Sequence, residues 1–161
     1  MSVLTLSVTQ VETICDEVRR FGAREKETGG FLLTSDRCTI SHVAIAGSAA
    51  IERDWGKFIV RREALDQLFT YAEDRDLHIA AMFHSHMQGA FLSRIDRTGG
   101  INMDGFISIV IPTFRNPPSD TSKWGFWIFQ NREWRQCQSW PTAASASHSP
   151  LRFDANGVHD A

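Results

Sequence analysis

The chain has 161 residues, of which 42% are hydrophobic and 22% charged, and its formal net charge is −2. A chain of this length supports one domain around one buried core, and its near-neutral charge argues against a positive field that would attract nucleic acid or an anionic membrane. No stretch approaches the roughly 18 apolar residues of a membrane span, and Glu12, Asp16 and Glu17 interrupt the region where a signal peptide needs an apolar run. We therefore expect a soluble protein with neither a nucleic-acid nor a membrane partner.

The cysteines indicate the compartment. Cys15, Cys38 and Cys137 are widely spaced and include no CxxC pair, which argues against a disulfide framework and against a zinc site built from thiolates. A reducing environment suits such residues, so we expect a cytoplasmic protein.

The N-terminal part of the chain predicts a helix followed by a hairpin. Thr9 and Glu12 have the spacing of a capping box, and apolar residues then recur at helical spacing through residues 11–21. The runs at 31–34 and 39–45 predict two strands joined by a short connection.

The rest of the chain alternates strands with one further helix and predicts a mixed α/β fold. The elements expected in order are a strand at 55–60, a helix at 61–76, buried strands at 78–83 and 106–111, and a hairpin at 124–129 and 133–137. Small residues such as Ala143, Ala144, Ser145 and Ala146 then dominate. We therefore assign residues 1–140 to one folded domain and residues 141–161 to a flexible C-terminal tail outside the core.

A polar cluster follows the strand at 78–83 and has the composition of a metal site. His84 and His86 are two residues apart, so in an extended segment both imidazoles leave the same side of the chain. With Asp96 as third ligand, a zinc ion would keep its fourth tetrahedral position free for water, as catalytic zinc requires. Zinc lowers the pKa of such a water to about 7 in comparable sites.

Three segments together resemble the signature of the JAMM (MPN+) zinc metalloprotease family, which places a glutamate before a glycine-containing strand, then an HSH triplet, then SxxD. The matching segments are Glu27-Thr28-Gly29-Gly30-Phe31-Leu32-Leu33, His84-Ser85-His86 and Ser93-Arg94-Ile95-Asp96. The order of helices and strands between them also agrees with that family, over residues 2–138. The resemblance implies an MPN/JAB-like fold, in which a central, mostly antiparallel and curved sheet is flanked by helices, with residues 1–140 as the catalytic domain.

The resemblance also implies roles for particular residues. One zinc ion per chain would be held by His84, His86 and Asp96, and Glu27 would be the general base. Ser93 would help stabilise the oxyanion, and Ser85 would orient the ligands rather than touch the substrate.

The activity implied is that of an isopeptidase or peptidase that cleaves after the C-terminus of ubiquitin or a ubiquitin-like protein. The short chain looks like the compact prokaryotic branch of the family, and removal of a modifier from conjugates and maturation of its precursor both stay open. Two rival functions are a catalytically silent MPN-type scaffold and a zinc hydrolase of small peptides or amides.

The chain departs from the family pattern in the loop after the second histidine. Met87 stands where proline is common, and the loop from His86 to Ser93 is one residue shorter than usual. Asp104 is therefore kept as a second choice for the third ligand, and Glu25 as an alternative to Glu27. The remaining histidines are assigned no chemistry: His42, His78, His148 and His159.

Overall fold

The computed structural model describes residues 3–144 and 149–161. The helices are α1 (Val8–Gly22), α2 (Arg62–Asp74) and α3 (Arg94–Gly99), with a 3-10 turn η1 (Thr121–Lys123). The strands are β1 (Leu6–Ser7), β2 (Gly29–Thr34), β3 (His42–Ala46), β4 (Ile51–Arg53), β5 (Phe58–Val60), β6 (His78–Ser85), β7 (Ile107–Ile111), β8 (Gly125–Gln130), β9 (Glu133–Gln136), β10 (Thr142–Ala143), β11 (Leu151–Asp154) and β12 (Gly157–Asp160).

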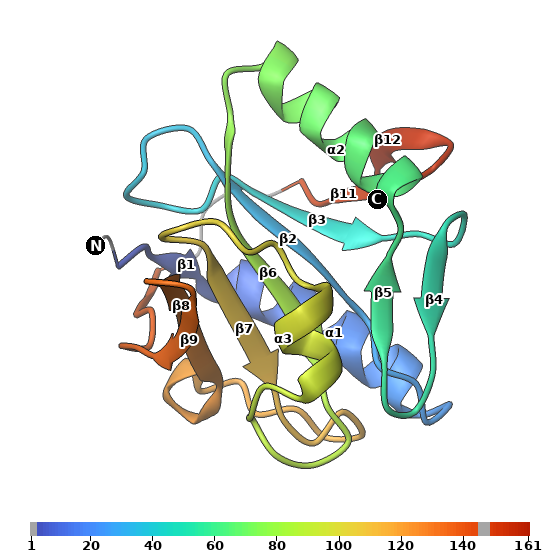
Figure 1. Cartoon of the computed structure of the whole chain (residues 1–161), viewed down its shortest axis with the longest axis vertical. Coiled ribbons are helices and arrows are strands. Elements are labelled where there is room, and N and C mark those ends of the chain that lie inside the picture. Colours follow the sequence, from blue (N-terminus) through green and yellow to red (C-terminus); the bar gives the residue numbers. More distant parts are fainter. Residues whose placement is uncertain (1–2, 145–148) are drawn as a thin grey trace.

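The main sheet has eight strands in the order β12-β11-β3-β2-β6-β7-β8-β9. Strands β11 and β3 run parallel, as do β6 and β7, and the other neighbours are antiparallel. In Figure 1, α1 lies behind this sheet, whereas α2 and α3 lie in front of it. The expected mixed α/β fold with a mostly antiparallel sheet is confirmed.

Each face of the sheet has its own hydrophobic cluster. On one face, the apolar stripe of α1, formed by Val11, Ile14 and Val18, packs in the same cluster as Phe83 and Ile109 of the sheet. On the other face, a second cluster gathers the apolar side of α2, including Ala64 and Leu68, with residues of β2, β3 and β11. All six residues of β2 are buried because both sides of this central strand are covered.

Helix α1 begins earlier than the sequence pattern indicated. Its N-cap is Ser7, whose side chain accepts a hydrogen bond from the backbone of Gln10, while the Gln10 side chain accepts one from the backbone of Ser7. This is a capping box two residues before the expected pair of Thr9 and Glu12.

The C-terminal segment differs most from expectation and corrects the assignment of residues 141–161 to a tail outside the core. Strand β11 pairs with β3, and β12 closes a hairpin on β11. Phe153 is fully buried and meets the ring of Phe31 edge to face, with centroids 5.6 Å apart. The two-residue turn is Ala155–Asn156. Gly157, the first residue of β12, adopts a φ of 129° that favours glycine. Residues 145–148, which include Ser145, Ala146 and His148, lie outside the described residues.

Within the described ranges, no helix is both long and apolar enough to cross a bilayer.

Candidate metal centre

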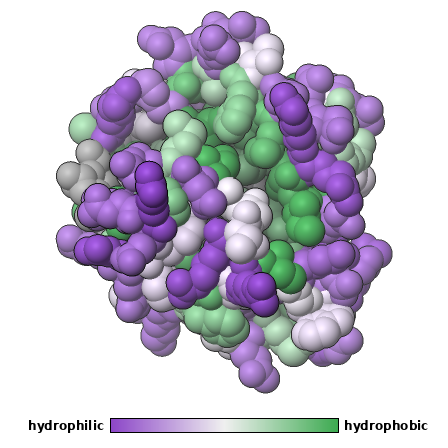
Figure 2. Space-filling model, viewed as in Figure 1, coloured by the Kyte–Doolittle hydropathy of each residue, from purple (hydrophilic) through white to green (hydrophobic). Residues whose placement is uncertain are grey.

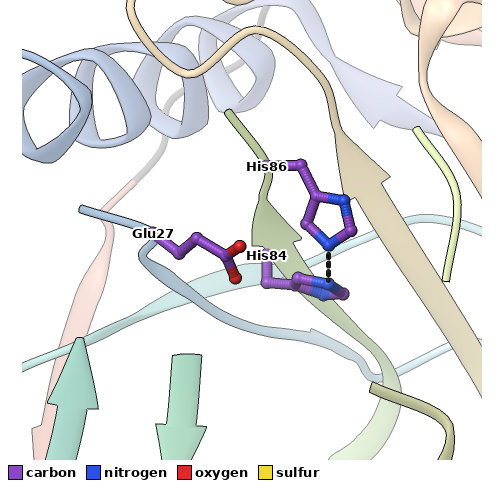
Figure 3. Close-up of side chains that lie close together, drawn as sticks. All are labelled: Glu27, His84 and His86. Atoms are coloured by element: carbon purple, nitrogen blue, oxygen red, sulfur yellow. Dashed lines mark hydrogen bonds between the residues drawn. The ribbon is translucent and has the colours of Figure 1, made fainter. Parts of the chain in front are cut away.

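The HSH triplet lies at the end of the central strand β6, between β2 and β7. His84 is paired with Gly29 of β2 and Val110 of β7, and the backbone N–H of His86 donates to the carbonyl of Ile111 at 2.9 Å. Both histidines are buried, and their Nε2 atoms are 3.1 Å apart (Figure 3). The strand geometry therefore brings both imidazoles to one point, as the spacing predicted.

Asp96 completes a triangle with the two histidines. Its Oδ2 lies 3.0 Å from Nε2 of His84 and 3.0 Å from Nε2 of His86. Ligand atoms around a tetrahedral zinc ion stand about 3.3 Å apart, so the three atoms have close to the spacing that such an ion requires. The short loop between His86 and Ser93 thus does not prevent Asp96 from reaching the histidines.

Helix α3 fixes the position of Asp96 through its first turn. The Ser93 side chain accepts a hydrogen bond from the backbone N–H of Asp96 at 3.2 Å, and the backbone N–H of Ser93 donates to Oδ2 of Asp96 at 2.9 Å. Burial alone would raise the pKa of Asp96, but the hydrogen bonds from His84 and His86 outweigh it and hold this pKa well below its usual range. The carboxylate is therefore ionised and able to act as a ligand.

The tautomer of His86 also suits a metal. Nδ1 of His86 lies 3.1 Å from the carbonyl oxygen of Gly89. Because a carbonyl only accepts, this nitrogen carries a proton, and Nε2, the ring atom that faces His84 and Asp96, is the one that could bind a metal once it carries no proton. Nδ1 of His84 is buried and has no hydrogen-bond partner in the described part of the chain.

Glu27 lies beside the two histidines, at the start of β2, and Figure 3 shows its carboxyl group pointing towards His84. Glu27, His84 and His86 are all buried, and one ligand atom from each lies within 4.8 Å of the others, close enough to hold a metal ion. Oε1 of Glu27 is buried and has no partner among the described residues. An orphaned buried oxygen next to imidazole nitrogens fits a site built for a cation.

The pKa of Glu27 and that of Asp96 are shifted in opposite directions in the metal-free protein. Burial, helped by the charges of Asp96 and Asp54, raises the pKa of Glu27 from 4.5 to about 9. Two neighbouring carboxyl groups whose pKa values are driven apart have different chemical tasks. Asp96 forms the tight triangle with the two histidines and Glu27 lies beside them, so both carboxyl groups border the place where a metal ion could be held.

Backbone contacts on both sides hold Glu27 in place. The N–H of Glu27 donates to the carbonyl of Asp54 at 2.8 Å, and the backbone N–H of Thr28 donates to the Ser85 hydroxyl at 2.9 Å. Ser85 therefore contacts the segment that carries Glu27 rather than either histidine. A Cβ on Gly29 would lie 2.1 Å from the carbonyl oxygen of Phe83, so glycine lets β2 approach β6 at this point.

The alternative acidic residues lie away from the triangle. Glu25 is exposed and forms an ion pair with Arg115, and Asp104 is exposed in a pocket with Leu4 and Trp140. The structure thus brings together His84, His86, Asp96 and Glu27, with Ser93 and Ser85 beside them. The chemical roles assigned to these residues stay predictions.

A mostly apolar cavity of about 290 Å³ adjoins the centre, and sequence reasoning did not find it. His84 and Asp96 form part of its wall, and its other lining residues include Phe31 (β2), Val60 (β5) and Leu65 (α2). Figure 2, which has the viewpoint of Figure 1, shows hydrophobic residues gathered between hydrophilic ridges on this face. The cavity is also lined by Trp134, whose Nε1 is buried without a partner in the described ranges.

Solved structures of other proteins share this fold at low sequence identity. A protein of Desulfitobacterium hafniense has a TM-score of 0.68 and 14% identity, over 88% of this chain and 94% of that one. A JAB1/MPN domain protein from Archaeoglobus fulgidus has a TM-score of 0.54 and 13% identity, over 89% of this chain and 100% of that one. A protein of Salinibacter ruber has a TM-score of 0.55 and 18% identity, over 89% of this chain and 95% of that one.

These likenesses show the fold alone, and the fold is of the MPN/JAB kind. No family model matches the chain, and no curated protein sequence matches it.

Proposed function

We propose that the protein is a zinc-dependent peptidase that cleaves the peptide or isopeptide bond after the C-terminus of a ubiquitin-like protein. The observation that carries the proposal is the triangle of two imidazole nitrogens and one carboxylate oxygen, 3.0–3.1 Å apart. Beside it lies the carboxyl group of Glu27, whose buried Oε1 has no partner among the described residues. We place this activity in the cytoplasm because Cys15, Cys38 and Cys137 are all free thiols.

His84, His86 and Asp96 would hold the zinc ion. This donor set, two neutral imidazoles and one carboxylate, is typical of catalytic zinc. When bound, zinc supplies Lewis acidity that polarises a scissile carbonyl and makes water easier to deprotonate.

Glu27 would take the proton from the attacking water and pass it to the leaving nitrogen. A general base works best when its pKa is near the working pH. Burial already raises the pKa of Glu27 far above that of an ordinary glutamate, and a nearby cation would bring it down again towards neutral pH. The contacts of Asp54 and Ser85 with the backbone at Glu27 and Thr28 would keep the carboxylate in position.

Ser93 would have two roles, one structural and one chemical. Its oxygen accepts the hydrogen bond from the backbone of Asp96, which leaves its own proton free to donate. The side chain is half-buried at the beginning of α3. We propose that this proton stabilises the negative charge that develops on the carbonyl oxygen during attack.

The apolar cavity beside His84 and Asp96 supports an extended peptide as substrate. Its size suits one or two apolar side chains upstream of the scissile bond. The Nε1–H of Trp134, which has no partner within residues 3–144 and 149–161, would donate to a backbone carbonyl of the same segment. An extended C-terminal tail offers both groups, which is why a ubiquitin-like protein is proposed.

Replacement of the proposed base tests the function. We expect Glu27→Gln to lower the rate of cleavage of a ubiquitin-like fusion by about 100-fold or more while zinc stays bound. Glu25→Gln is the matched control and should cleave at the wild-type rate. An equally active Glu27→Gln protein would overturn the proposal, and turnover of short peptides without cleavage of any modifier fusion would indicate a hydrolase of small amides instead.

A further inference from the structure

A second polar site, rich in basic residues, lies next to the segment Lys26–Thr28. A surface depression of about 630 Å³ adjoins it, lined from the end of α1, the segment after it, β4 and β11. Figure 1 shows the end of α1 and the β4–β5 hairpin at the same corner of the molecule. Its cationic residues, which we call the basic pocket, are Arg20, Arg24, Lys26, Arg53 and Arg152.

The acidic residues nearby are already engaged. Glu17, almost fully buried, is shared between Arg20 at 2.7 Å and Arg152 at 3.5 Å. The carboxylate of Asp154 accepts hydrogen bonds from the backbone of Ser48, Ala49 and Asn156. In the described part of the chain, Arg24, Lys26 and Arg53 have no carboxylate within ion-pair distance.

Several contacts hold the side chain of Arg53 in a fixed position in the pocket. Its guanidinium donates to the hydroxyl of Thr28 at 2.9 Å and to the carbonyls of Gly47 and Ala46 at 2.6 and 2.7 Å, and it lies 4.1 Å from the centroid of the Phe21 ring. Burial lowers the pKa of Arg53 to about 10. Among the described residues, the hydrogen bonds of this half-buried cation go to neutral acceptors and the charge of Glu17 acts on it only from a distance, so an anion that enters beside Arg53 would stabilise it further.

We propose that the basic pocket binds an acidic peptide segment of the protein substrate. This proposal rests on the proposed function, because it assumes that the substrate is a protein. The whole chain carries a net charge of −2, so this local excess of cations is a feature of one site rather than of the surface. The pocket is open. The guanidinium of Arg24 makes no hydrogen bond or ion pair in the described part of the chain, so it presents a free fork-shaped donor that matches a carboxylate.

The same contacts argue against a nucleic acid. Single strands are bound through free aromatic faces on which bases stack. The aromatic residue of the pocket is Phe21, and its ring is already covered by Arg53 and by Arg20, which lies 4.5 Å from the centroid. Peptide carboxylates need no such face.

The position of the pocket links it to the chemistry. Lys26 directly precedes Glu27, and Arg53 donates to Thr28, which directly follows it. An acidic segment bound here would hold a substrate protein next to the metal centre without touching the reacting atoms. The pocket would therefore strengthen substrate binding rather than speed the chemical step.

Direct binding tests the proposal without cleavage. A fluorescein-labelled short polyglutamate peptide is titrated with the full chain, and fluorescence anisotropy gives the dissociation constant. We expect binding that weakens as salt is added, because exposed charges are screened. Arg24→Glu should weaken it about fivefold or more, whereas Arg62→Glu, which makes the same charge change on exposed α2, should weaken it less than about twofold.

Several outcomes would overturn the proposal. Absence of polyglutamate binding by the wild-type chain would do so, as would equal weakening by the two variants. Tighter binding of a single-stranded oligonucleotide that is lost in Arg24→Glu would indicate a nucleic acid instead. An active peptidase that fails to bind polyglutamate would overturn only this inference, whereas an inactive protein that binds it through Arg24 would overturn only the proposed function.

Discussion

The metal centre and the basic pocket lie on either side of one short segment, Lys26–Thr28, yet they are built in opposite ways. The side chains of His84, His86 and Asp96 are at most 7% exposed and present acceptor atoms for a cation. The pocket is open to solvent and presents donors to an anion. Removal of an interaction partner costs more free energy for a buried group than for an exposed one. Substitutions in the metal centre should therefore have large effects, whereas substitutions in the basic pocket should have smaller effects that depend on salt concentration.

The largest effect should come from the hairpin that carries Arg152 to the pocket. Phe153→Ala removes a fully buried ring from the cluster between the sheet and α2, and we expect it to lower the free energy of unfolding by about 3–5 kcal/mol. Urea denaturation of the purified protein measures this. The matched control is Val158→Ala on the half-buried neighbouring strand, which should cost far less. A neutral Phe153→Ala would mean that residues 149–161 do not belong to the core.

Replacement of Asp96, the proposed third ligand, should have the next largest effect. Asp96→Asn keeps the shape of the side chain but removes its charge, and we expect zinc affinity to fall by at least about 100-fold. Competition with a chromophoric chelator measures the affinity. Asp104→Asn is the control, since that carboxylate lies away from the triangle. If both variants bind zinc as tightly as the wild type, Asp96 is not a ligand.

The raised pKa of Glu27 predicts how the metal-free protein responds to pH. A carboxyl group whose pKa is higher in the folded state stabilises that state fully below its unfolded pKa, and the stabilisation is lost as pH rises through the folded value. Metal-free protein should therefore lose stability as pH rises between about 4.5 and 9. Glu27→Gln should flatten this slope in thermal melts with a chelator present. An unchanged slope would mean that Glu27 ionises freely.

The smallest effect should follow from loss of the Ser93 cap. Ser93→Ala removes one hydrogen bond from the first turn of a six-residue helix and should cost about 1 kcal/mol of stability. If Ser93 also stabilises the oxyanion, the kcat of folded Ser93→Ala protein should fall as well. Ser93→Thr, which keeps a hydroxyl, should then restore both the stability and kcat. If Ser93→Thr recovers stability but not kcat, the exact position of the hydroxyl matters for stabilising the oxyanion. If kcat is unchanged in Ser93→Ala, Ser93 only caps the helix.

The sequence predicted the metal centre because its spacing signals are local. His84 and His86 share one side of a strand, and Ser93 and Asp96 share the first turn of a helix, so each pair is visible without knowledge of the fold. Glu27 was assigned through the resemblance to the JAMM signature, which places a glutamate before a glycine-containing strand such as the one that begins at Gly29. The apolar cavity and the contact from Asp54 to Glu27 were not visible, because they depend on the place of the β4–β5 hairpin in space.

The basic pocket and the C-terminal hairpin could not be predicted for a related reason. Arg20, Arg53 and Arg152 are far apart in the sequence. Arg152 reaches the other two because β11 pairs with β3. The signal that could have found the hairpin was the pair Asn156 and Gly157 between alternating residues. The small residues that precede the hairpin, from Ala143 to Ala146, led instead to the prediction of a flexible tail.

The central claim is that this chain holds a metal ion in a site formed by His84, His86 and Asp96. Elemental analysis of protein purified without added metal and without a histidine tag tests it most directly, with His84→Ala/His86→Ala as the comparison. We expect about one zinc ion per wild-type chain and none in the double variant, with circular dichroism showing both folded. A folded wild-type protein without zinc would contradict the claim and favour a fold that acts as a scaffold, whereas a double variant that keeps zinc would show that the ion binds elsewhere.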